Sequence, residues 1–365
     1  MSFKTPHPRE FIAEEVAVRL SNSALKAEQS KVLDEIQWSV IMNENWLNMY
    51  VPRTFGGLEL SLPEIIRIEE GISWADGSTG WVVTLCSGAA WFIGFLDPEL
   101  AADIFKFDQV CFAGSGAING TADRSAGKYA IEGYWPYATG SPMASVFTLN
   151  CLVKENGDQV YDTTGKPVVK SFVLWRDEVN IHRTWNAMGM VATASHSFEA
   201  KNILVPENRC FTIQPNYSVL PQIIFQYPFQ QLAESTLAVN LSGMACKFVD
   251  LVEAKLSAKS ANSSAQIVDP IRTKLDFARN NFYYSTDQAW NSLAVGGAVP
   301  HNLLAQVTET SRQLAGCCTE VVNTLYPFCG LEAADTRYEI NRVWRNFNTA
   351  VQHNLFRGFR MESLE

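Results

Sequence analysis

The hydrophobic pattern of this 365-residue chain changes its period twice, and these two changes constrain the fold more than any other feature. Up to residue 108, apolar side chains recur at helical spacing. From Gln109 the pattern becomes short apolar or alternating runs separated by turns, which is typical of β-strands. Helical spacing returns after Pro221. The sequence therefore predicts helices, then a β-domain, then helices again.

The first 108 residues are expected to form a helical domain. A broad apolar face from Ala24 to Trp46 predicts one helix. Ser61-Leu62-Pro63-Glu64 has the form of a capping box, so a second helix should begin there and end near Asp76. Residues 79–94 are apolar on nearly all sides. This pattern indicates a buried helix, and the segment is too short to cross a bilayer comfortably.

Residues 109–220 are expected to form a β-barrel or sandwich, and residues 221–365 a four-helix bundle. Asn156-Gly157-Asp158 reads as a hairpin turn within the β-domain. The bundle helices are expected at about residues 229–258, 271–293, 303–325 and 336–359. The predicted fold class is α+β with more helix than strand.

Charge and cysteine usage exclude several classes of function. The formal net charge of -9 argues against a nucleic-acid backbone or an anionic membrane as the main partner. The amino-terminal segment carries Pro and acidic residues where a signal peptide needs an apolar core. The eight cysteines show no metal-binding spacing, so we expect no metal site and reduced thiols in the cytoplasm.

One segment of the predicted β-domain, Gly127 to Ser141, carries unusual side chains for a strand and its turn. It places Trp135, Thr139 and Ser141 beside Gly140, where a ligand or a second backbone segment can approach closely. These side chains suit one face of a flat, polar-edged aromatic ring such as an isoalloxazine. An ordinary hairpin with a buried tryptophan is the alternative interpretation.

The order of helical domain, β-domain and four-helix bundle resembles that of the acyl-CoA dehydrogenase superfamily. Three segments carry the resemblance: residues 51–58 (VPRTFGGL) with 74–78 (WADGS), residues 185–196 (WNAMGMVATASH), and Val205-Pro206. Within the superfamily the sequence is most similar to the branch of two-component, flavin-dependent monooxygenases. The segments similar to that branch are residues 79–82 (TGWV), 133–140 (GYWPYATG) and 345–354 (RNFNTAVQHN).

The resemblance implies a flavin cofactor, FAD or FMN, possibly received as diffusible reduced flavin from a separate reductase. It implies a small aromatic or heterocyclic substrate and a homotetramer. Trp135, Thr139 and Ser141 would line the flavin ring. Thr193 and Ser195 would add contacts from the neighbouring strand. His196 follows these hydroxyls, at the cofactor's edge or in a structural role.

His353 and Asn354 are the candidate catalytic residues. Asn354 lies where the dehydrogenases that keep a catalytic glutamate on the last helix would carry it, and an amide cannot abstract a proton. On a continuous helix, His353 would share a face with Asn346, Thr349 and Arg357 and could deprotonate a phenol. A buried or surface histidine without catalytic function is the alternative. The branch often has a second active-site histidine in the amino-terminal domain, which residues 87–90 (SGAA) lack.

Two other functions stay open at this point. One is an acyl-CoA dehydrogenase or oxidase with a relocated base, for which Glu234 and Glu253 are the carboxylates on the first bundle helix. The other is a catalytically inactive scaffold that keeps the flavin fold. For an oxygenase we expect a closed apolar pocket at the junction of β-domain and bundle. Its predicted aromatic lining is Phe225, Tyr227, Phe229, Tyr326 and Phe328.

Overall fold

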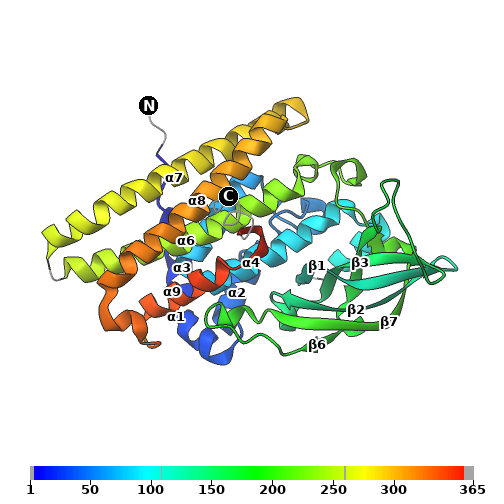
Figure 1. Ribbon diagram of the computed structural model, residues 1–365, viewed down its shortest axis with the longest axis horizontal. Coiled ribbons are helices and arrows are strands. Elements are labelled where there is room, and N and C mark those ends of the chain that lie inside the picture. The colour runs from blue at the N-terminus through cyan, green and yellow to red at the C-terminus, as the bar shows by residue number, and fades with distance from the viewer. Residues whose placement is uncertain (1–3, 108, 259, 357–365) are drawn as a thin grey trace.

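A computed structural model of the chain describes residues 4–107, 109–258 and 260–356. Figure 1 shows the strands gathered at one end of the molecule and the long helices at the other, with α4 between them. Secondary structure changes from helix to strand between Phe105 and Phe112, and the long helices resume at Phe229. The predicted order of helices, β-domain and helices is confirmed.

The amino-terminal region contains five α-helices. They are α1 (Glu14–Ser30), α2 (Glu35–Asn43), α3 (Leu62–Ala75), α4 (Gly77–Ala90) and α5 (Pro98–Phe105). The capping box that starts α3 forms as predicted, since the Ser61 amide donates to the Glu64 carboxylate at 2.8 Å. The single helix expected from Ala24 to Trp46 is wrong. Lys31 takes a left-handed conformation that ends α1, and Asp34 caps α2 by accepting from the Ile36 amide.

Eight strands form one mixed sheet in the order β6-β7-β2-β1-β3-β5-β8, with β4 paired to β3. Their bounds are β1 (Phe112–Ser125), β2 (Lys128–Ala138), β3 (Val146–Glu155), β4 (Asp158–Gln159), β5 (Val169–Trp175), β6 (Asn180–His182), β7 (His196–Pro206) and β8 (Cys210–Phe211). Strands β1 and β3 are parallel. The predicted hairpin turn at Asn156-Gly157 joins β3 to β4.

The sheet curls around a core of its own. Phe147 on β3 and Phe198 on β7 have ring centroids 4.8 Å apart, although two strands separate β3 from β7 in the sheet. Tyr129 on β2 and Phe172 on β5 meet in the same way at 5.0 Å. Such contacts require the sheet to fold over on itself, as the predicted barrel or sandwich does.

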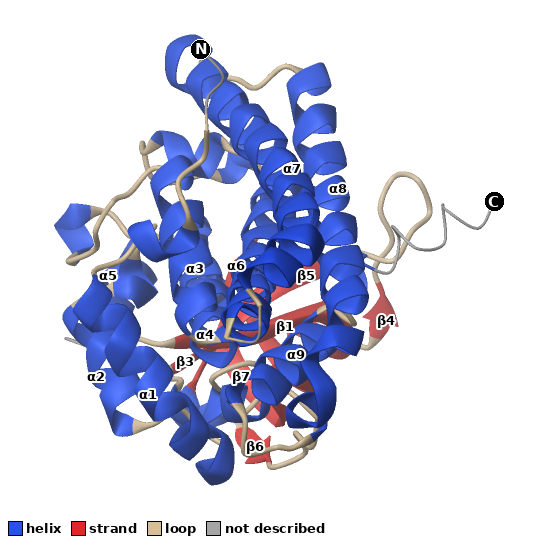
Figure 2. Cartoon of the chain, turned by 90° about the vertical axis from the view of Figure 1, so that its left-hand side faces the viewer, coloured by secondary structure: helices blue, strands red, loops and turns tan. Residues whose placement is uncertain are grey.

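The carboxyl-terminal region contains the four bundle helices. They are α6 (Phe229–Ser257), α7 (Ala261–Gly296), α8 (His301–Leu325) and α9 (Glu339–Ala350). Helices α6 and α8 run in the same direction. Gln231 bonds Thr308 near their amino-terminal ends, and Lys255 in the last turn of α6 bonds Glu332, just beyond the end of α8. In Figure 2 these two helices and α7 extend away from the strands, while α4 and α9 lie next to them.

Two bundle helices differ from their predicted lengths. Helix α7 begins at Ala261 instead of near residue 271, and it contains Pro270. A proline removes one helical hydrogen bond, but the extra turns bury Val268 completely against the core. Helix α9 ends at Ala350, where a helix reaching about residue 359 was expected. Residues beyond 356 lie outside the described chain.

Helix α4 is the centre of the molecule. The apolar stretch Gly77–Phe95 has a mean hydropathy of 1.2, and by composition alone it could cross a membrane. However, 83% of that stretch is buried inside the fold, which identifies it as the expected buried core helix. Its side chains belong to a core that also includes residues from both helical regions. The two helical regions therefore pack as one unit around α4.

Candidate functional site

Four predicted hydroxyls meet where β2 ends and β7 begins. Thr139 Oγ1 lies 2.9 Å from Ser195 Oγ, which in turn lies 2.8 Å from Thr193 Oγ1. Ser141 Oγ donates to the Ala194 carbonyl oxygen at 3.1 Å. We call Thr139, Ser141, Thr193 and Ser195 the hydroxyl cluster. Two segments more than 50 residues apart in sequence thus form one polar site, and all four side chains are buried.

The backbone around the hydroxyl cluster is strained. Tyr137, Met190 and Ala194 have φ angles of 64°, 53° and 45°, which side-chain-bearing residues rarely adopt. The pairing of β2 with β7 shifts register between Trp135 and Ala138, as in a β-bulge. Such conformations cost free energy and are found mostly where function requires them. Their grouping beside the hydroxyls supports a ligand site here.

The bulge turns Tyr137 away from the sheet. Tyr137 is 72% exposed, and the centroids of the Tyr137 and Trp185 rings lie 6.3 Å apart with the rings nearly perpendicular. These two rings offer aromatic surface next to the hydroxyl cluster. Tyr137 belongs to the segment that suggested a ring-binding site, but it was not among the predicted flavin contacts, because simple alternation along β2 does not reveal the bulge. The run of a phenol directly before Ala138-Thr139-Gly140 was the available signal.

Trp135 is enclosed in the core of the β-domain. It has no exposed surface, its ring stacks on Phe198 at 5.3 Å, and its indole N–H donates to the Asn150 carbonyl oxygen at 3.0 Å. The expectation that Trp135 lines a flavin ring is therefore wrong in this structure. Its neighbour Tyr137 occupies the accessible position instead.

A small open pocket borders the hydroxyl cluster. Its lining comes from the α1–α2 connection, from α2 and α4, and from the two loops that carry the hydroxyl cluster, residues 139–145 and 183–195. The lining residues are Val32, Leu33, Trp38, Val82, Gly140, Pro142, Met143, Ala192, Thr193 and Ala194. Most of this lining is apolar, with the Thr193 hydroxyl beside it.

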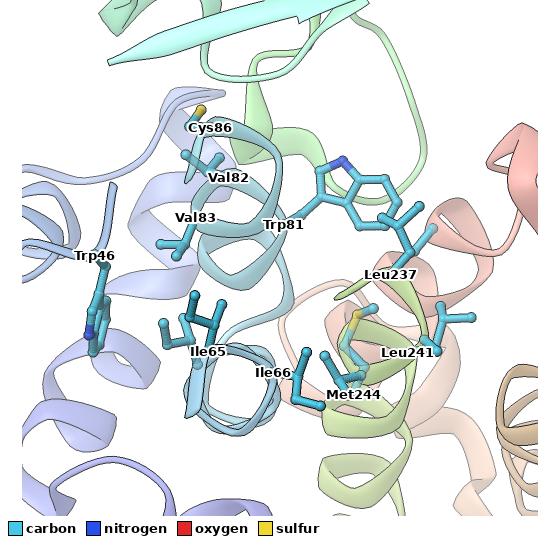
Figure 3. Packing of buried hydrophobic residues seen from close by; sticks show 14 of the residues in the cluster. Trp46, Ile65, Ile66, Trp81, Val82, Val83, Cys86, Leu237, Leu241 and Met244 are labelled. Carbon is cyan, nitrogen blue, oxygen red and sulfur yellow. The ribbon is translucent and has the colours of Figure 1, made fainter. Parts of the chain in front are cut away.

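Helix α4 connects this pocket to the predicted catalytic histidine. The Cys86 sulfur lies 3.7 Å from the Thr139 carbonyl oxygen, and Val82 contributes to the pocket. Figure 3 shows Val82 and Cys86 on the side of α4 that faces the strands, while Trp81 points toward Leu237 of α6. The ring of Trp81 meets the imidazole of His353 edge to face, at 5.8 Å.

His353 lies at a break in the chain and not within a continuous helix. The shared helical face with Asn346 and Thr349 is therefore wrong, and Arg357 lies outside the described residues. Its Nδ1 accepts from the Leu355 amide at 3.4 Å, and Asn354, which follows it, is exposed. Burial lowers the pKa of His353 to about 4, so the imidazole is neutral near pH 7 and able to accept a proton.

Helix α9 holds the second loop of the site in place. The Met190 amide donates to the Asn346 side-chain oxygen at 2.7 Å, and Arg345 donates to the Met188 carbonyl oxygen at 2.6 Å. Gly189 lies so close to α9 that an added β-carbon would be 2.0 Å from the Arg345 carbonyl oxygen. The motif at residues 345–354 thus positions Thr193 and Ser195 through this loop.

His196, the first residue of β7, has a structural position next to this loop. Its Nδ1 accepts from the Trp185 amide at 3.1 Å, which fixes the start of the Trp185 loop against β7. Burial, followed by the charge of Arg183, lowers the pKa of His196 below its usual value. The neutral imidazole therefore orients Trp185. Of the two roles expected for His196, the structural one has a visible partner.

Known proteins share this architecture over nearly the whole chain. The crystal structure of the HsaA monooxygenase from Mycobacterium tuberculosis superposes with a TM-score of 0.87 at 18% identity, covering 96% of this chain and 95% of that one. Residues 232–357 match the family described as "Acyl-CoA dehydrogenase, C-terminal domain". The carboxyl-terminal part of the chain is therefore similar to the acyl-CoA dehydrogenases.

Two proteins similar in sequence are named as monooxygenases. By sequence, HsaA of M. tuberculosis, a "flavin-dependent monooxygenase, oxygenase subunit", is 21% identical over 351 residues, covering 90% of this chain and 84% of its own. Indole-3-acetate monooxygenase from Pseudomonas putida is 26% identical over 316 residues, covering 83% of this chain and 78% of its own. XiaF from Streptomyces sp., solved in complex with FADH2 and glycerol, has a TM-score of 0.83 at 20% identity, covering 96% of this chain and 91% of that one.

The carboxylates proposed for an acyl-CoA dehydrogenase are engaged elsewhere. Both oxygens of Glu234 accept hydrogen bonds within the bundle, from Thr308 at 2.6 Å and from Gln230 at 3.1 Å. Glu253 pairs with Arg272 at 2.6 Å near the other end of α6. Neither carboxylate is therefore placed as a base beside the hydroxyl cluster.

The predicted aromatic pocket divides into two groups at opposite ends of the bundle. Phe229 stacks on Trp91 at the start of α6, with Phe225 also against Trp91. Tyr326 follows the end of α8, where it stacks on Trp344 at 4.8 Å. Because α6 and α8 run in the same direction over more than 20 residues each, these groups cannot line one pocket. The expectation of a joint lining is wrong.

Proposed function

We propose that the protein is the oxygenase component of a two-component, flavin-dependent monooxygenase that acts on a small aromatic or heterocyclic compound. The observation that carries the proposal is the arrangement around α4. The hydroxyl cluster lies against Cys86 on one side of this helix. The neutral His353 lies against Trp81 on the adjacent side of the same helix. The monooxygenase relatives supply the reaction class.

The residues of the site fit a flavin. Tyr137 and Trp185 offer aromatic faces to its ring, and Thr193 and Ser195 offer hydroxyls to the ring's polar edge. Ser141 fixes the loop that carries Gly140 by bonding Ala194. When bound in its reduced form, flavin supplies the electrons that activate O2 for transfer of one oxygen atom to the substrate. A separate reductase would deliver that reduced flavin, in line with the description of HsaA as an oxygenase subunit.

His353 would take the proton from a substrate hydroxyl. A phenolate is a more electron-rich ring than a phenol, so deprotonation prepares the substrate for attack on oxygen. The neutral state of His353 suits this role, and Trp81 fixes the imidazole plane. The apolar side chains of α4 would keep water away from the reacting atoms.

Flavin binding is the first test. The protein should quench the fluorescence of FAD or FMN in a saturable titration, and the tighter of the two identifies the cofactor. Thr193→Val with Ser195→Ala should weaken binding at least tenfold. Ser171→Ala is the matched control, because this β-domain hydroxyl bonds Asn150 away from the site. Absence of binding for both flavins in either redox state would favour the inactive scaffold.

Turnover is the second test. With reduced flavin supplied by a flavin reductase and O2 dissolved in the buffer, the protein should convert phenols or heterocycles to hydroxylated products. The same protein should show no dehydrogenation of acyl-CoA thioesters, because Asn354 and the engaged Glu234 provide no base for that reaction. Thioester oxidation without aromatic hydroxylation would instead support the dehydrogenase.

We also propose a homotetramer in a reducing, cytoplasmic environment. Phe277 and Tyr284, seven residues apart on one face of α7, are 67% and 55% exposed. Exposed aromatic surface of this kind usually marks a protein interface. All eight cysteines are free, which suits a reducing compartment. Sedimentation should show a tetramer that Phe277→Asp with Tyr284→Asp dissociates, and a wild-type monomer at micromolar concentration would contradict the assembly.

A further inference from the structure

One face of α4 is open while the rest of the helix is buried. Within Gly77–Ala90, Leu85 and Gly88 are the two residues that are not fully buried, and Phe92 just beyond is also partly exposed. Trp81, which is itself buried with 8% exposure, precedes them on the same side of the helix, at i, i+4, i+7, i+11 spacing. We call Trp81, Leu85, Gly88 and Phe92 the open face of α4. A β-carbon at Gly88 would meet no atom within 4 Å.

The two ends of the open face differ chemically. At one end the His353 imidazole meets the Trp81 ring at 5.8 Å. At the other end Phe92 lies 5.5 Å from both Phe211 and Phe229. The face therefore runs from a neutral proton acceptor to a group of aromatic rings. Gly88 lies two turns from Trp81, about 10 Å along the helix axis.

The open face is next to the proposed flavin site. Val82 and Cys86, which contact the hydroxyl-cluster loop, each follow a residue of the open face by one position. One residue turns a helix by about 100°, so the two faces adjoin along the length of α4. A ligand on the open face would therefore lie beside a flavin ring bound at the hydroxyl cluster.

The chemistry of this wall favours uncharged aromatic ligands. Residues 77–95 include no Asp, Glu, Lys, Arg or His. A carboxylate or phosphate on the ligand would find no partner on α4 and would lose its hydration. Leu85, Phe92 and the ring of Trp81 instead suit the flat face of an aromatic compound.

We propose that the open face of α4 is the substrate wall and that Gly88 is the residue that sets the size of substrate accepted. The proposal rests on the proposed monooxygenase function. A one-ring phenol with its hydroxyl at His353 would not extend as far as Gly88. Compounds with two or three fused rings would reach this position and occupy the space that a side chain at residue 88 would fill. The substrate class is therefore an uncharged, multi-ring hydroxylated aromatic compound.

The test measures binding and does not need turnover. Calorimetry with the flavin-loaded protein would use phenol, 2-naphthol and 2-hydroxyanthracene as probes. Gly88→Leu should weaken the affinity for the two larger probes at least tenfold and change the affinity for phenol less than twofold. Leu85→Ala should leave the protein able to bind the larger probes. Gly316→Leu is the matched control, since this exposed helical glycine on α8 also has no atom near its β-position. It should change none of the three.

Several outcomes would overturn the proposal. Equal weakening of all three probes by Gly88→Leu would show a general distortion and not a size limit. Unchanged affinities, or no binding of the larger probes to the wild type, would place the substrate elsewhere. A shift of assembly state with Gly88→Leu would show that a second copy covers this face. Size-selective binding without oxygenation would leave the substrate wall standing and count only against the monooxygenase.

Discussion

Glu69 and Glu70 are neighbours on α3, both are completely buried, and their carboxyl groups have opposite surroundings. Arg279 of α7 donates to both oxygens of Glu70 at 2.8 Å, and the Tyr283 hydroxyl adds a third bond at 2.7 Å. Neither oxygen of Glu69 has a hydrogen-bond partner among the described residues. Burial raises the pKa of Glu69 well above its usual value, which favours the uncharged carboxyl.

The Glu70–Arg279 pair should stabilise the contact between the amino-terminal helices and the bundle. Arg279→Met removes the partner of a buried carboxylate and should lower the free energy of unfolding by about 3–5 kcal/mol. The matched control joins the same two helices, since Arg67 of α3 pairs with Asp287 of α7 at 2.9 Å, partly exposed. Arg67→Met should cost only about 0–1 kcal/mol. Urea unfolding measures the free energy of unfolding of both variants. Equal losses would show that the buried pair contributes no more to stability than the partly exposed pair.

Glu69 should make the protein less stable as pH rises. Its pKa is higher in the folded state than in the unfolded one, so the folded state holds more protons between the two values. Stability then falls as pH increases above about 4.5, by up to ~1.4 kcal/mol per pH unit. The Glu69→Gln variant should lose this pH dependence of stability and should be at least as stable as the wild type at pH 8. The test is to measure the free energy of unfolding of both proteins between pH 5 and 8. If the two plots of stability against pH are parallel, Glu69 ionises as it would in water.

The sequence predicts elements well where the cause is local, and site geometry poorly where the cause is distant. The start of α3 followed from Ser61 and Glu64, which are three residues apart. The different states of Glu69 and Glu70 depend on α7, more than 200 residues away. In the same way, Pro270 indicates a helix start locally, yet burial of Val268 extends α7 past it.

The candidate site shows the same division. Thr139, Thr193 and Ser195 were expected from two separate segments, and the structure brings them together. Trp135 and Tyr137 were misjudged because a bulge, fixed by pairing with β7, decides which of them reaches the surface. The alternation of side chains along β2 does not show how β2 pairs with β7, so it cannot predict the bulge.

Gly189 should be irreplaceable in the contact between α9 and the site loop. An alanine side chain there would overlap the Arg345 backbone, and relief would require the loop to move away from Asn346. Gly189→Ala should cost about 1–3 kcal/mol of stability, the usual range for overpacking, and speed hydrogen exchange of the Met190 amide. Gly116→Ala on β1 is the control, because nothing lies near its β-position. Unchanged exchange at Met190 would show that the loop tolerates the methyl group.

Tyr137, and not Trp135, should matter for flavin affinity. Tyr137→Ala removes an exposed ring and should weaken flavin binding several-fold with little loss of stability. Trp135→Phe keeps an aromatic ring against Phe198 but loses the bond to Asn150, so it should lower stability by about 1 kcal/mol or more and leave affinity nearly unchanged. Fluorescence titration and thermal unfolding separate these effects. The reverse pattern would return Trp135 to the binding site.

His353 should be required for turnover and dispensable for flavin binding, because the proposed cofactor contacts lie on the β-domain. His353→Ala should lower turnover of phenols with supplied reduced flavin by roughly a hundredfold or more, the usual scale for losing a positioned acid or base. His353→Asn should recover little, since an amide cannot take up the proton. His301→Ala, at the exposed start of α8, is the control and should retain full activity.

The pH dependence gives His353 a second, independent readout. Because its pKa of about 4 lies below the usual 6.5, the unfolded state binds more protons between these values. The stability that His353 contributes is therefore lost as pH falls from about 6.5 to 4, and His353→Ala should flatten that part of the unfolding curve. Proton NMR should show its imidazole titrating near pH 4. Wild-type turnover in His353→Ala would remove this residue from the mechanism, and a midpoint near 6.5 would show that the imidazole is open to water.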